Sequence, residues 1–422
     1  MFKKLTALLL AALMCVGAVA MTACSGDGKE AETSELPFEE VALDTDFEVP
    51  EDFKIGFIFL HDENSTYDKN FIDAANRMKE ALGLKDSQVL LKVNVEEGAA
   101  CADAARDLVS SGCDIVFADS FGHEPYMIEV ANEFPNVEFC HATGTKAHTE
   151  GLANFHNAFA DIYQGRFLAG VAAGMKLNEM IKDGKIKAEE AVIGYVGAFP
   201  YAEVVSGYTS FFLGARMMCE SATMKVRYTN SWYNEAEEKA AAEALINNDK
   251  CVLISQHADS MGAPTACEVA GVPNVSYNGS TVKACPETFI ISSAINWTPY
   301  FVYIVEQYVN GEAIAADWCG GIEEGSVVLS SINLDVAAEG TLAKIRELAE
   351  KIQSGELKVF DIDTFTVDGK KLETYLADVD DMGDYKGETE AIKDGYFNES
   401  GDRSAPYFDL RIDGITELTK AN

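Results

Sequence analysis

The sequence predicts an α/β protein of two similar lobes, each a doubly wound parallel sheet, with a ligand cleft between them. Short apolar runs such as Phe53–Leu60 alternate with segments of helical spacing along most of the chain, as in parallel sheets covered by helices. This alternation breaks at the polar segment Lys182–Glu190 and restarts at Val192. Polar and aromatic residues follow the ends of the strands, which is where open sheets of this kind bind ligands.

Composition limits the classes of partner. The chain has 422 residues, 48% hydrophobic and 24% charged, and this length suits two or three domains. The formal net charge is −36, from 33 basic and 69 acidic residues. Such an acidic surface repels phosphate backbones, so we expect no nucleic-acid partner.

The N-terminal segment predicts an exported lipoprotein. Two lysines precede the apolar run Leu5–Ala20, and small residues then lead to a cysteine, as in a secretory signal peptide. The cut site resembles a bacterial lipobox, which implies that residues 1–23 are removed and that Cys24 carries the lipid. A simple signal peptide with an incidental cysteine is the alternative. Residues 24–50 are expected to form a flexible acidic tether that holds the protein on the extracytoplasmic face of the cell membrane.

The cysteines after the signal segment do not indicate a disulfide framework. Export permits disulfides, but the eight cysteines from Cys101 to Cys319 show no C-x-x-C or dense spacing. Cys140 and Cys251 lie in apolar runs, where cysteine acts as a small hydrophobic residue. We therefore expect mostly free buried thiols, with one or two bridges left open.

Residues 51–185 are predicted to form the first lobe. The predicted strands are Phe53–Leu60, Val89–Val95, Asp114–Ala118, Val137–His141 and Leu152–Ala158, and the predicted helices are Asn70–Leu82, Ala99–Ser111, Tyr126–Glu133 and Asp161–Ile181. The last helix contains Gly165, Gly170 and Gly174. Each glycine weakens a helix by about 1 kcal/mol relative to alanine, so close packing or a bend is expected. The chain is expected to enter the second lobe near Lys182–Glu190.

Residues 186–296 are predicted to form the second lobe. The predicted strands are Val192–Gly197, Lys225–Thr229, Cys251–Ser255, Asn274–Tyr277 and Thr288–Ile295, and the predicted helices are Glu203–Met218, Glu235–Ile246, Gly262–Ala270 and, beyond the lobe, Thr298–Val309. Crossing segments that belong to the first lobe are expected near 297–320. Residues 321–422 are expected to wrap the lobes, with a strand at Ser326–Asn333, an amphipathic helix at Asp335–Ser354, and short β pieces at Phe365–Val367 and Tyr407–Ile412 in an acidic tail.

The candidate ligand-binding residues are polar or aromatic side chains near strand ends. They are Asn64, Tyr67, Ser120, Phe121, Phe199, Glu203, Trp232, Asp259, Asn278 and Trp297. Two flat rings facing each other across a cleft suit a planar heterocycle, because stacking is worth about 1–3 kcal/mol per base, and Phe199 is expected to be one such wall. Amides, hydroxyls and a carboxylate nearby suit the polar edge of a purine. For Phe121, Trp232 and Trp297 the alternative is burial in the core.

Motifs for catalysis are sparse. The sequence contains no G-x-S-x-G, G-x-G-x-x-G or Walker A pattern, so neither serine hydrolysis nor nucleotide-cofactor chemistry is indicated. His257 and Asp259 lack the further partners that a metal or acid–base site needs. The acidic run Asp378–Asp384 lacks the closing glutamate of a calcium loop. We therefore expect no catalytic residue, no metal and no cofactor.

Several segments together resemble the basic membrane protein (BMP) family of substrate-binding lipoproteins. Besides the lipobox they are Phe134–Phe139, His141–Gly144, Tyr163–Gly170, Ile193–Val196, Ala198–Pro200 with Glu203, Leu213–Arg216, Asn230–Tyr233, Gln256–Ser260 and Asn296–Tyr300. The resemblance covers most of Phe53–Leu334. It implies a type I periplasmic-binding-protein fold and delivery of a purine base or purine nucleoside to the permease and ATPase subunits of an ABC importer.

The resemblance also bears on the choice of ligand. The nucleoside-binding branch of the family carries an acidic residue and a lysine for the sugar, where this chain has Asn278–Ser280 and Ser293–Trp297. The chain is more similar to the branch with Trp232 and His257–Ser260, for which a free base such as adenine is implied. A membrane-anchored sensor of the same ligand and a nucleoside hydrolase are the alternative functions.

Overall fold

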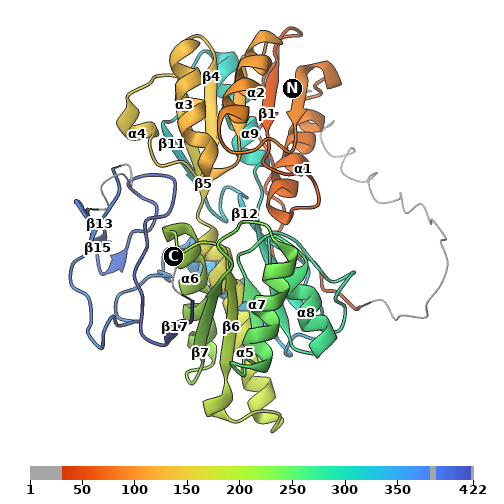
Figure 1. Ribbon diagram of the computed structural model, residues 1–422, viewed down its shortest axis with the longest axis vertical. Coiled ribbons are helices and arrows are strands. Elements are labelled where there is room, and N and C mark those ends of the chain that lie inside the picture. The colour runs from red at the N-terminus through yellow and green to blue at the C-terminus, as the bar shows by residue number, and fades with distance from the viewer. Residues whose placement is uncertain (1–30, 381–385, 420–422) are drawn as a thin grey trace, which may run out of the picture. The chain divides into compact units, whose positions relative to one another are not determined.

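Two largely parallel sheets organise residues 31–380 and 386–419, the part of the chain that the computed structural model describes (Figure 1). The predicted fold class is confirmed. The signal segment and Cys24 lie outside the described residues.

The first lobe contains a sheet in which every neighbouring pair is parallel. Its order is β11-β5-β4-β3-β1-β2. The strands are β1 (Ile55–Ile58), β2 (Val89–Lys92), β3 (Ile115–Ala118), β4 (Glu138–Ala142), β5 (Phe155–Ala160) and β11 (Asp317–Gly320). The helices are α1 (Thr66–Ala81), α2 (Ala99–Ser110), α3 (Glu124–Glu133), the short α4 (Ala147–Glu150) and α9 (Thr298–Asn310). Helices α1 and α9 pack together, as do α2 and α3, and the two pairs contribute to separate apolar clusters.

The second lobe contains a seven-stranded sheet of order β12-β10-β9-β8-β6-β7-β17. Only β12 is antiparallel to its neighbour. The strands are β6 (Val192–Gly197), β7 (Thr223–Tyr228), β8 (Leu253–Gln256), β9 (Asn274–Tyr277), β10 (Phe289–Ile295), β12 (Val327–Leu329) and β17 (Ile415–Glu417). The helices are α5 (Ile162–Lys182), α6 (Ala202–Met218), α7 (Glu235–Asn247), α8 (Gly262–Ala270) and α10 (Thr341–Gln353).

The chain crosses between the lobes earlier than the sequence predicted. The long helix α5 packs against α6, α10 and β10 of the second lobe, so the crossing lies at Asp161 and not near Lys182–Glu190. Two further crossings follow β10 and β11, since α9 and β11 belong to the first lobe. Helix α5 is buried on nearly all sides, and its sequence therefore shows no polar face that would reveal which lobe it joins.

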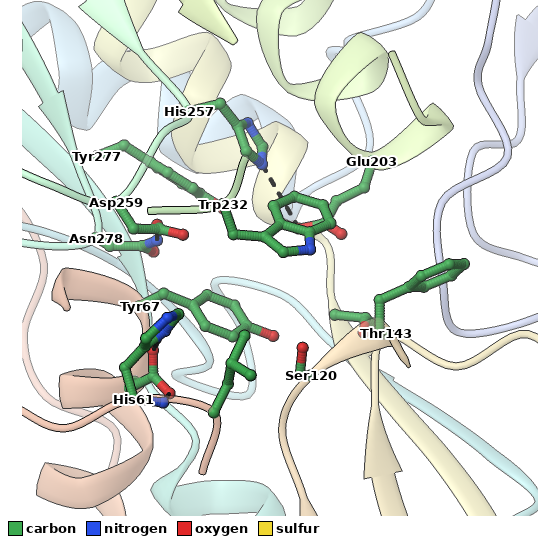
Figure 2. Close-up of a pocket in the computed structure, with 13 residues that line it drawn as sticks. His61, Tyr67, Ser120, Thr143, Glu203, Trp232, His257, Asp259, Tyr277 and Asn278 are labelled. Atoms are coloured by element: carbon green, nitrogen blue, oxygen red, sulfur yellow. Dashed lines mark hydrogen bonds and ion pairs between the residues drawn. The ribbon is translucent and has the colours of Figure 1, made fainter. Parts of the chain in front are cut away.

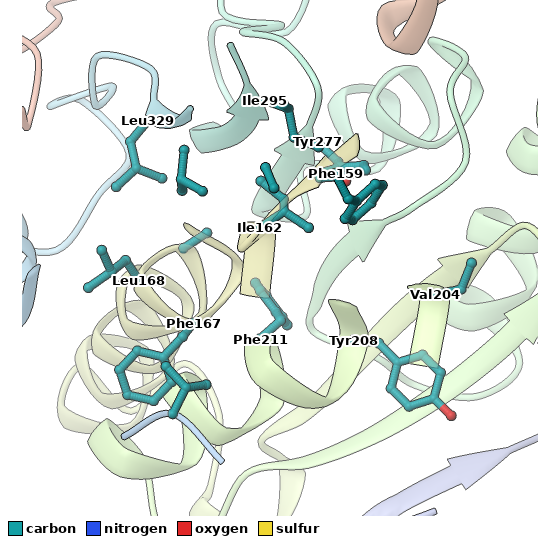
Figure 3. Packing of buried hydrophobic residues seen from close by; sticks show 14 of the residues in the cluster. Phe159, Ile162, Phe167, Leu168, Val204, Tyr208, Phe211, Tyr277, Ile295 and Leu329 are labelled. Atoms are coloured by element: carbon teal, nitrogen blue, oxygen red, sulfur yellow. The ribbon is translucent and has the colours of Figure 1, made fainter. Parts of the chain in front are cut away.

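Glycines bring α5 and α6 into backbone contact (Figure 3). A Cβ atom on Gly170 would lie 1.9 Å from the carbonyl oxygen of Phe211, and one on Gly214 would lie 2.0 Å from that of Phe167. The close packing predicted from the glycines of this helix is therefore confirmed. Phe167 and Phe211 then fill the space beside the contact.

Trp297 lies in the core of the first lobe. Its side chain is 1% exposed and stacks on Phe71, with ring centroids 4.5 Å apart. Phe117 and Phe159 complete its surroundings. For Trp297 the alternative of burial in the core is therefore confirmed. The crossing after β10 places the indole between α1 and the sheet.

The segment before the first strand lies on the second lobe, unlike the flexible tether expected for residues 24–50. Within its described part, Thr33 forms a β-bridge with Asn333, and Arg346 donates hydrogen bonds to the carbonyl oxygens of Leu36 and Pro37. The segment packs there because several of its side chains, which lie between acidic residues, are hydrophobic and contact the main core. They are Phe38, Leu43, Phe47 and Val49.

The C-terminal tail runs along both lobes, in blue in Figure 1. Its described strands are β13 (Leu376–Ala377), β14 (Thr389–Glu390), β15 (Ile392–Lys393), β16 (Tyr396–Phe397) and the edge strand β17. The β pieces predicted at Phe365–Val367 and Tyr407–Ile412 are wrong, apart from a single bridge at Val367. Tyr407 and Phe408 are buried, so their apolar character reflects packing on the body of the protein and not strand pairing.

Eight cysteines from Cys101 to Cys319 are free thiols in the described chain, and all but Cys319 are fully buried. Burial raises the pKa of the Cys113 thiol to about 11.

Among residues 31–380 and 386–419, no helix combines the length and apolar character needed to cross a bilayer.

Substitution of Gly170 by alanine tests the helix contact. Gly170→Ala should lower the free energy of unfolding by about 1–3 kcal/mol through overpacking, although alanine favours helix by about 1 kcal/mol. Chemical denaturation measures the change. Met217→Ala, at a 48% exposed position of α6, is the matched control and should shift stability by about 0.5 kcal/mol or less. A Gly170→Ala protein more stable than the wild type would contradict the contact.

Candidate functional site

A cavity lies between the two lobes, at the carboxyl ends of their strands (Figure 2). The cavity is lined by Leu60, His61, Tyr67, Asp68, Ser120, Phe121, Thr143, Glu203, Trp232, His257, Asp259, Tyr277 and Asn278. Its position is the one expected for open α/β sheets.

The structure brings together most of the residues predicted to bind a ligand. Those that line the cavity are Tyr67, Ser120, Phe121, Glu203, Trp232, Asp259 and Asn278. Three predicted residues do not line it. Asn64 is exposed and donates a hydrogen bond to Asp62, and Trp297 lies in the core. Phe199 stands behind Trp232, with ring centroids 5.0 Å apart.

Six lining residues are absent from the ten candidate ligand-binding residues: Leu60, His61, Asp68, Thr143, His257 and Tyr277. Thr143 directly follows β4, so the strand-end rule that selected Ser120 would also have selected it. Asp68 lies in the first turn of α1 and carries no motif that distinguishes it from a helix-capping acid.

Aromatic rings from both lobes reach the cavity and are held by neighbours. Tyr67 packs edge-on against Phe71, at 4.9 Å between centroids, and its hydroxyl donates to the carbonyl oxygen of Asp119 at 2.8 Å. Trp232 enters from the second lobe, and Figure 2 shows it across the cavity from Tyr67. The two rings therefore offer apolar faces from opposite lobes.

Asp259 and Asn278 form a polar pair at one side of the cavity. The amide nitrogen of Asn278 donates to Oδ1 of Asp259 at 3.1 Å. Burial raises the pKa of Asp259 well above its usual range, the nearby acids Glu238 and Asp68 raise it further, and the hydrogen bond from Asn278 opposes them only in part. Asp259 therefore favours the neutral acid more than an exposed aspartate does, and the neutral acid has an O–H that can donate.

A second carboxyl cluster lies on the first-lobe side. Asp68 accepts hydrogen bonds from the backbone of His61 at 2.7 Å and from the hydroxyl of Ser65 at 2.6 Å. Burial alone would raise the pKa of Asp68, but the hydrogen bonds from His61 and Ser65 outweigh it, and the pKa lies below its usual value. Burial and the charge of Asp68 raise the pKa of Asp119 well above its usual range. Asp68 is thus the ionised member and Asp119 the neutral one.

His257 and Glu203 face each other at the second-lobe side. Nε2 of His257 lies 3.5 Å from Oε1 of Glu203 but forms no hydrogen bond. Burial lowers the pKa of His257, and Glu203 opposes that shift, so the imidazole is neutral near pH 7. Beneath it, the buried Arg166 donates to the hydroxyl of Tyr195 and lies over the ring of Tyr277 at 5.0 Å.

Thr143 has a left-handed backbone, with φ of 66°. A β-branched residue in this region is a genuine outlier, and such strain costs of order 1–3 kcal/mol and is common at ligand sites. Its amide donates to the carbonyl oxygen of Ala158. Strand pairing therefore holds this residue at the edge of the cavity.

Contacts across the cleft show that the lobes meet around the cavity. The amide and the hydroxyl of Thr66 both donate to the carbonyl oxygen of Asp259, at 3.2 and 2.9 Å. Asn70 donates to Asn278 at 3.4 Å. The cleft is therefore closed, and the cavity is largely shielded from water.

Away from the cavity, three acids of the described tail bring carboxylate oxygens within 4.8 Å of one another: Asp378, Asp380 and Glu388. Oε1 of Glu388 already accepts hydrogen bonds from the amides of Val379 and Asp380. Such acidic groups are common on an acidic surface, and this one has no link to the ligand cavity.

The chain matches a protein-family model and is similar to four curated proteins, two of them at more than 30% identity. Residues 60–363 match the family Bmp, described as ABC transporter substrate-binding protein PnrA-like. The purine-binding protein BAB2_0673 of Brucella abortus is 31% identical over 314 residues, covering 74% of this chain and 83% of that protein. A Haloferax volcanii protein, TsgA13, provisionally described as an ABC transporter glucose-binding protein, is 32% identical over 273 residues, covering 64% of this chain and 66% of that protein.

A solved structure supports the fold. An ABC transporter solute-binding protein from Aeropyrum pernix K1 superposes with a TM-score of 0.59 at 16% identity, covering 73% of this chain and 93% of that chain. Proteins of this class bind a ligand and work with permease and ATPase subunits, and they are binding components, not enzymes. The chain therefore belongs to the Bmp family of PnrA-like substrate-binding proteins of ABC transporters.

Proposed function

We propose that this protein is a lipid-anchored, extracytoplasmic receptor that binds a purine base or purine nucleoside between its lobes and delivers it to an ABC importer. The observation that carries the proposal is the cavity between the lobes, where rings from both lobes adjoin the buried carboxyl of Asp259 and the amide of Asn278. The printed name of the Brucella abortus relative supports the choice of a purine.

In this proposal, Trp232 and Tyr67 contact the two faces of the base. A purine is flat, and stacking on aromatic rings is worth about 1–3 kcal/mol per base. Phe199 acts through Trp232, because its ring contacts the indole and not the cavity. This differs from the direct stacking role expected for Phe199 from the sequence.

Asp259 and Asn278 recognise the polar edge of the base. A neutral carboxylic acid donates through its O–H and accepts through its carbonyl oxygen, and an amide offers the same pair of functions. An adenine edge, with a ring nitrogen beside an exocyclic amine, offers the complementary pair, as in the pairing of asparagine with adenine. In its neutral form Asp259 also avoids the cost of burying an unpaired charge beside a neutral ligand.

Binding is coupled to closure of the lobes. The ligand contacts both lobes and therefore favours the closed form over an open one. No bond is made or broken, so the residues position the ligand and exclude water.

A thermal-shift screen with adenine, adenosine, guanine and glucose tests the ligand class. A ligand that binds the folded state stabilises it by about 2.7 kcal/mol at a concentration of 100 Kd, so adenine or adenosine should raise the melting temperature. Glucose is the rival suggested by the Haloferax volcanii relative. A shift with glucose and none with any purine compound would refute the proposal.

Trp232 variants test the stacking surface. Trp232→Ala should weaken adenine binding by about 1–3 kcal/mol, measured by isothermal titration calorimetry, because it removes one face of the sandwich. Trp232→Phe keeps a ring and should lose less, and Phe199→Ala should also lose less because it acts only through the indole. Equal affinity of Trp232→Ala and the wild type would remove this residue from the site.

Anchoring through Cys24 is tested by Cys24→Ala. If the cysteine carries the lipid, the variant should leave the membrane fraction and lose incorporation of labelled fatty acid, because no other described segment can span the bilayer. Membrane association that is unchanged in the variant would show that the attachment lies elsewhere.

A further inference from the structure

The C-terminal tail joins the two lobes beside the cleft (Figure 1). Ser404 donates through its amide and its hydroxyl to Oδ1 of Asp317, at 2.8 and 2.7 Å, and Asp317 belongs to β11 of the first lobe. Earlier in the same segment, Glu399 accepts a hydrogen bond from Ser206 of α6 in the second lobe. We call residues 399–404 the strap. The family match ends at residue 363, so the strap lies in a segment that this match does not cover.

Buried side chains fix the strap in place. Arg403 is 2% exposed, and its guanidinium donates to the carbonyl oxygens of Ala405 at 3.1 Å and Pro406 at 3.2 Å. Phe408, which follows, is buried and stacks on Phe360 with ring centroids 4.4 Å apart. Because the strap is ordered and contacts both lobes, opening of the cleft must stretch it or break the contacts at one of its ends.

One hydroxyl of the strap lies between two carboxyls. Oγ of Ser400 lies 2.5 Å from Oε2 of Glu399 and 2.8 Å from Oδ1 of Asp161, the residue at which the chain first crosses between the lobes. A hydroxyl has a single proton and can donate to only one of these carboxyls. The other carboxyl must then be protonated, so that its own O–H donates to Ser400. The arrangement is therefore satisfied when the two carboxyls share one proton.

Glu399 is the carboxyl that retains this proton. It is 3% exposed, whereas Asp161 is only partly buried. Burial raises the pKa of Glu399 to about 8, and the acids Asp161 and Glu203 contribute to the rise. Hydrogen bonds from Ser206 and Ser400 offset only part of it. The docked strap therefore favours the neutral form of Glu399 at neutral pH.

The other groups that face Glu399 do not supply a positive charge. Burial, together with the nearby acids, raises the pKa of the Tyr163 phenol on α5 and of the Cys319 thiol on β11, so both groups are neutral. Arg403, the cation of the strap, is directed to backbone carbonyls. Ionisation of Glu399 therefore sets its charge against Asp161 across a single hydroxyl, and this repulsion disfavours the docked strap.

We propose that residues 399–404 form a proton-dependent strap that favours the closed cleft while Glu399 is protonated and favours it less once Glu399 ionises. A group whose pKa is raised in the docked state favours docking most below its ordinary pKa of about 4.3. This contribution is lost as the pH rises to about 8, the pKa of docked Glu399. The strap acts on the equilibrium between closed and open forms and not on the ligand, so the inference goes beyond the proposed purine receptor.

The test measures the distance between the lobes in the full-length protein, without added ligand, by single-molecule fluorescence energy transfer. Dyes are attached at the exposed Ala100 of α2 and Ala240 of α7 through a non-natural amino acid, because the chain has native thiols. The closed-to-open ratio should fall by up to about tenfold per pH unit between about pH 5 and about pH 8, and then level off. Glu399→Gln keeps a neutral side chain of similar shape and should remove this pH dependence.

Glu373→Gln, at an exposed acid of the tail, is the matched control and should keep the wild-type pH profile. Ser404→Ala removes a side-chain contact with β11 and should lower the closed fraction at acid pH, which keeps the test decisive if Glu399→Gln does not fold. A wild-type distance that does not change with pH, a wild-type pH profile in Glu399→Gln, or an unchanged closed fraction in Ser404→Ala would overturn the proposal. Because no ligand is used, none of these outcomes decides whether the protein binds purines.

Discussion

Backbone contact between α5 and α6 is the constraint on which the second lobe depends. Gly170 and Gly214 allow the carbonyl oxygens of the facing helix to approach where a side chain would otherwise lie. Helix α5 begins where the chain leaves the first lobe, and α6 begins beside Glu203. The contact therefore fixes the first crossing and one cavity residue relative to each other, and a looser helix pair would displace both.

The surface and the cavity differ in charge. The net charge of −36 lies on a chain whose cavity contains several acids. Burial raises the pKa of Asp259 well above its usual range, whereas hydrogen bonds from His61 and Ser65 hold the pKa of Asp68 below its usual value. A carboxyl that is protonated can both donate and accept. A cavity lined by acids therefore need not present only charged hydrogen-bond acceptors.

Both ends of the described chain support the two-lobed body. The segment that contains Thr33 lies on the second lobe, and the tail joins the second sheet through β17 while Ser404 contacts β11 of the first. A tail with contacts on both lobes must move, or lose contacts, when the cleft opens. The tail contact at Ser404 and the closure of the cleft are thus physically linked.

The sequence alone determined the alternation of strands and helices, the two lobes and the sheet edge that forms the site, because these follow from local apolar periodicity and from the polar residues after each strand. It could not separate Trp232 from Trp297, since both follow strands: the first faces the cavity, and the crossing after β10 turns the second into the core. Nor could it assign α5 to a lobe or bring Ser404 of the tail to β11. Those outcomes depend on contacts between segments far apart in the chain, which only the tertiary structure decides.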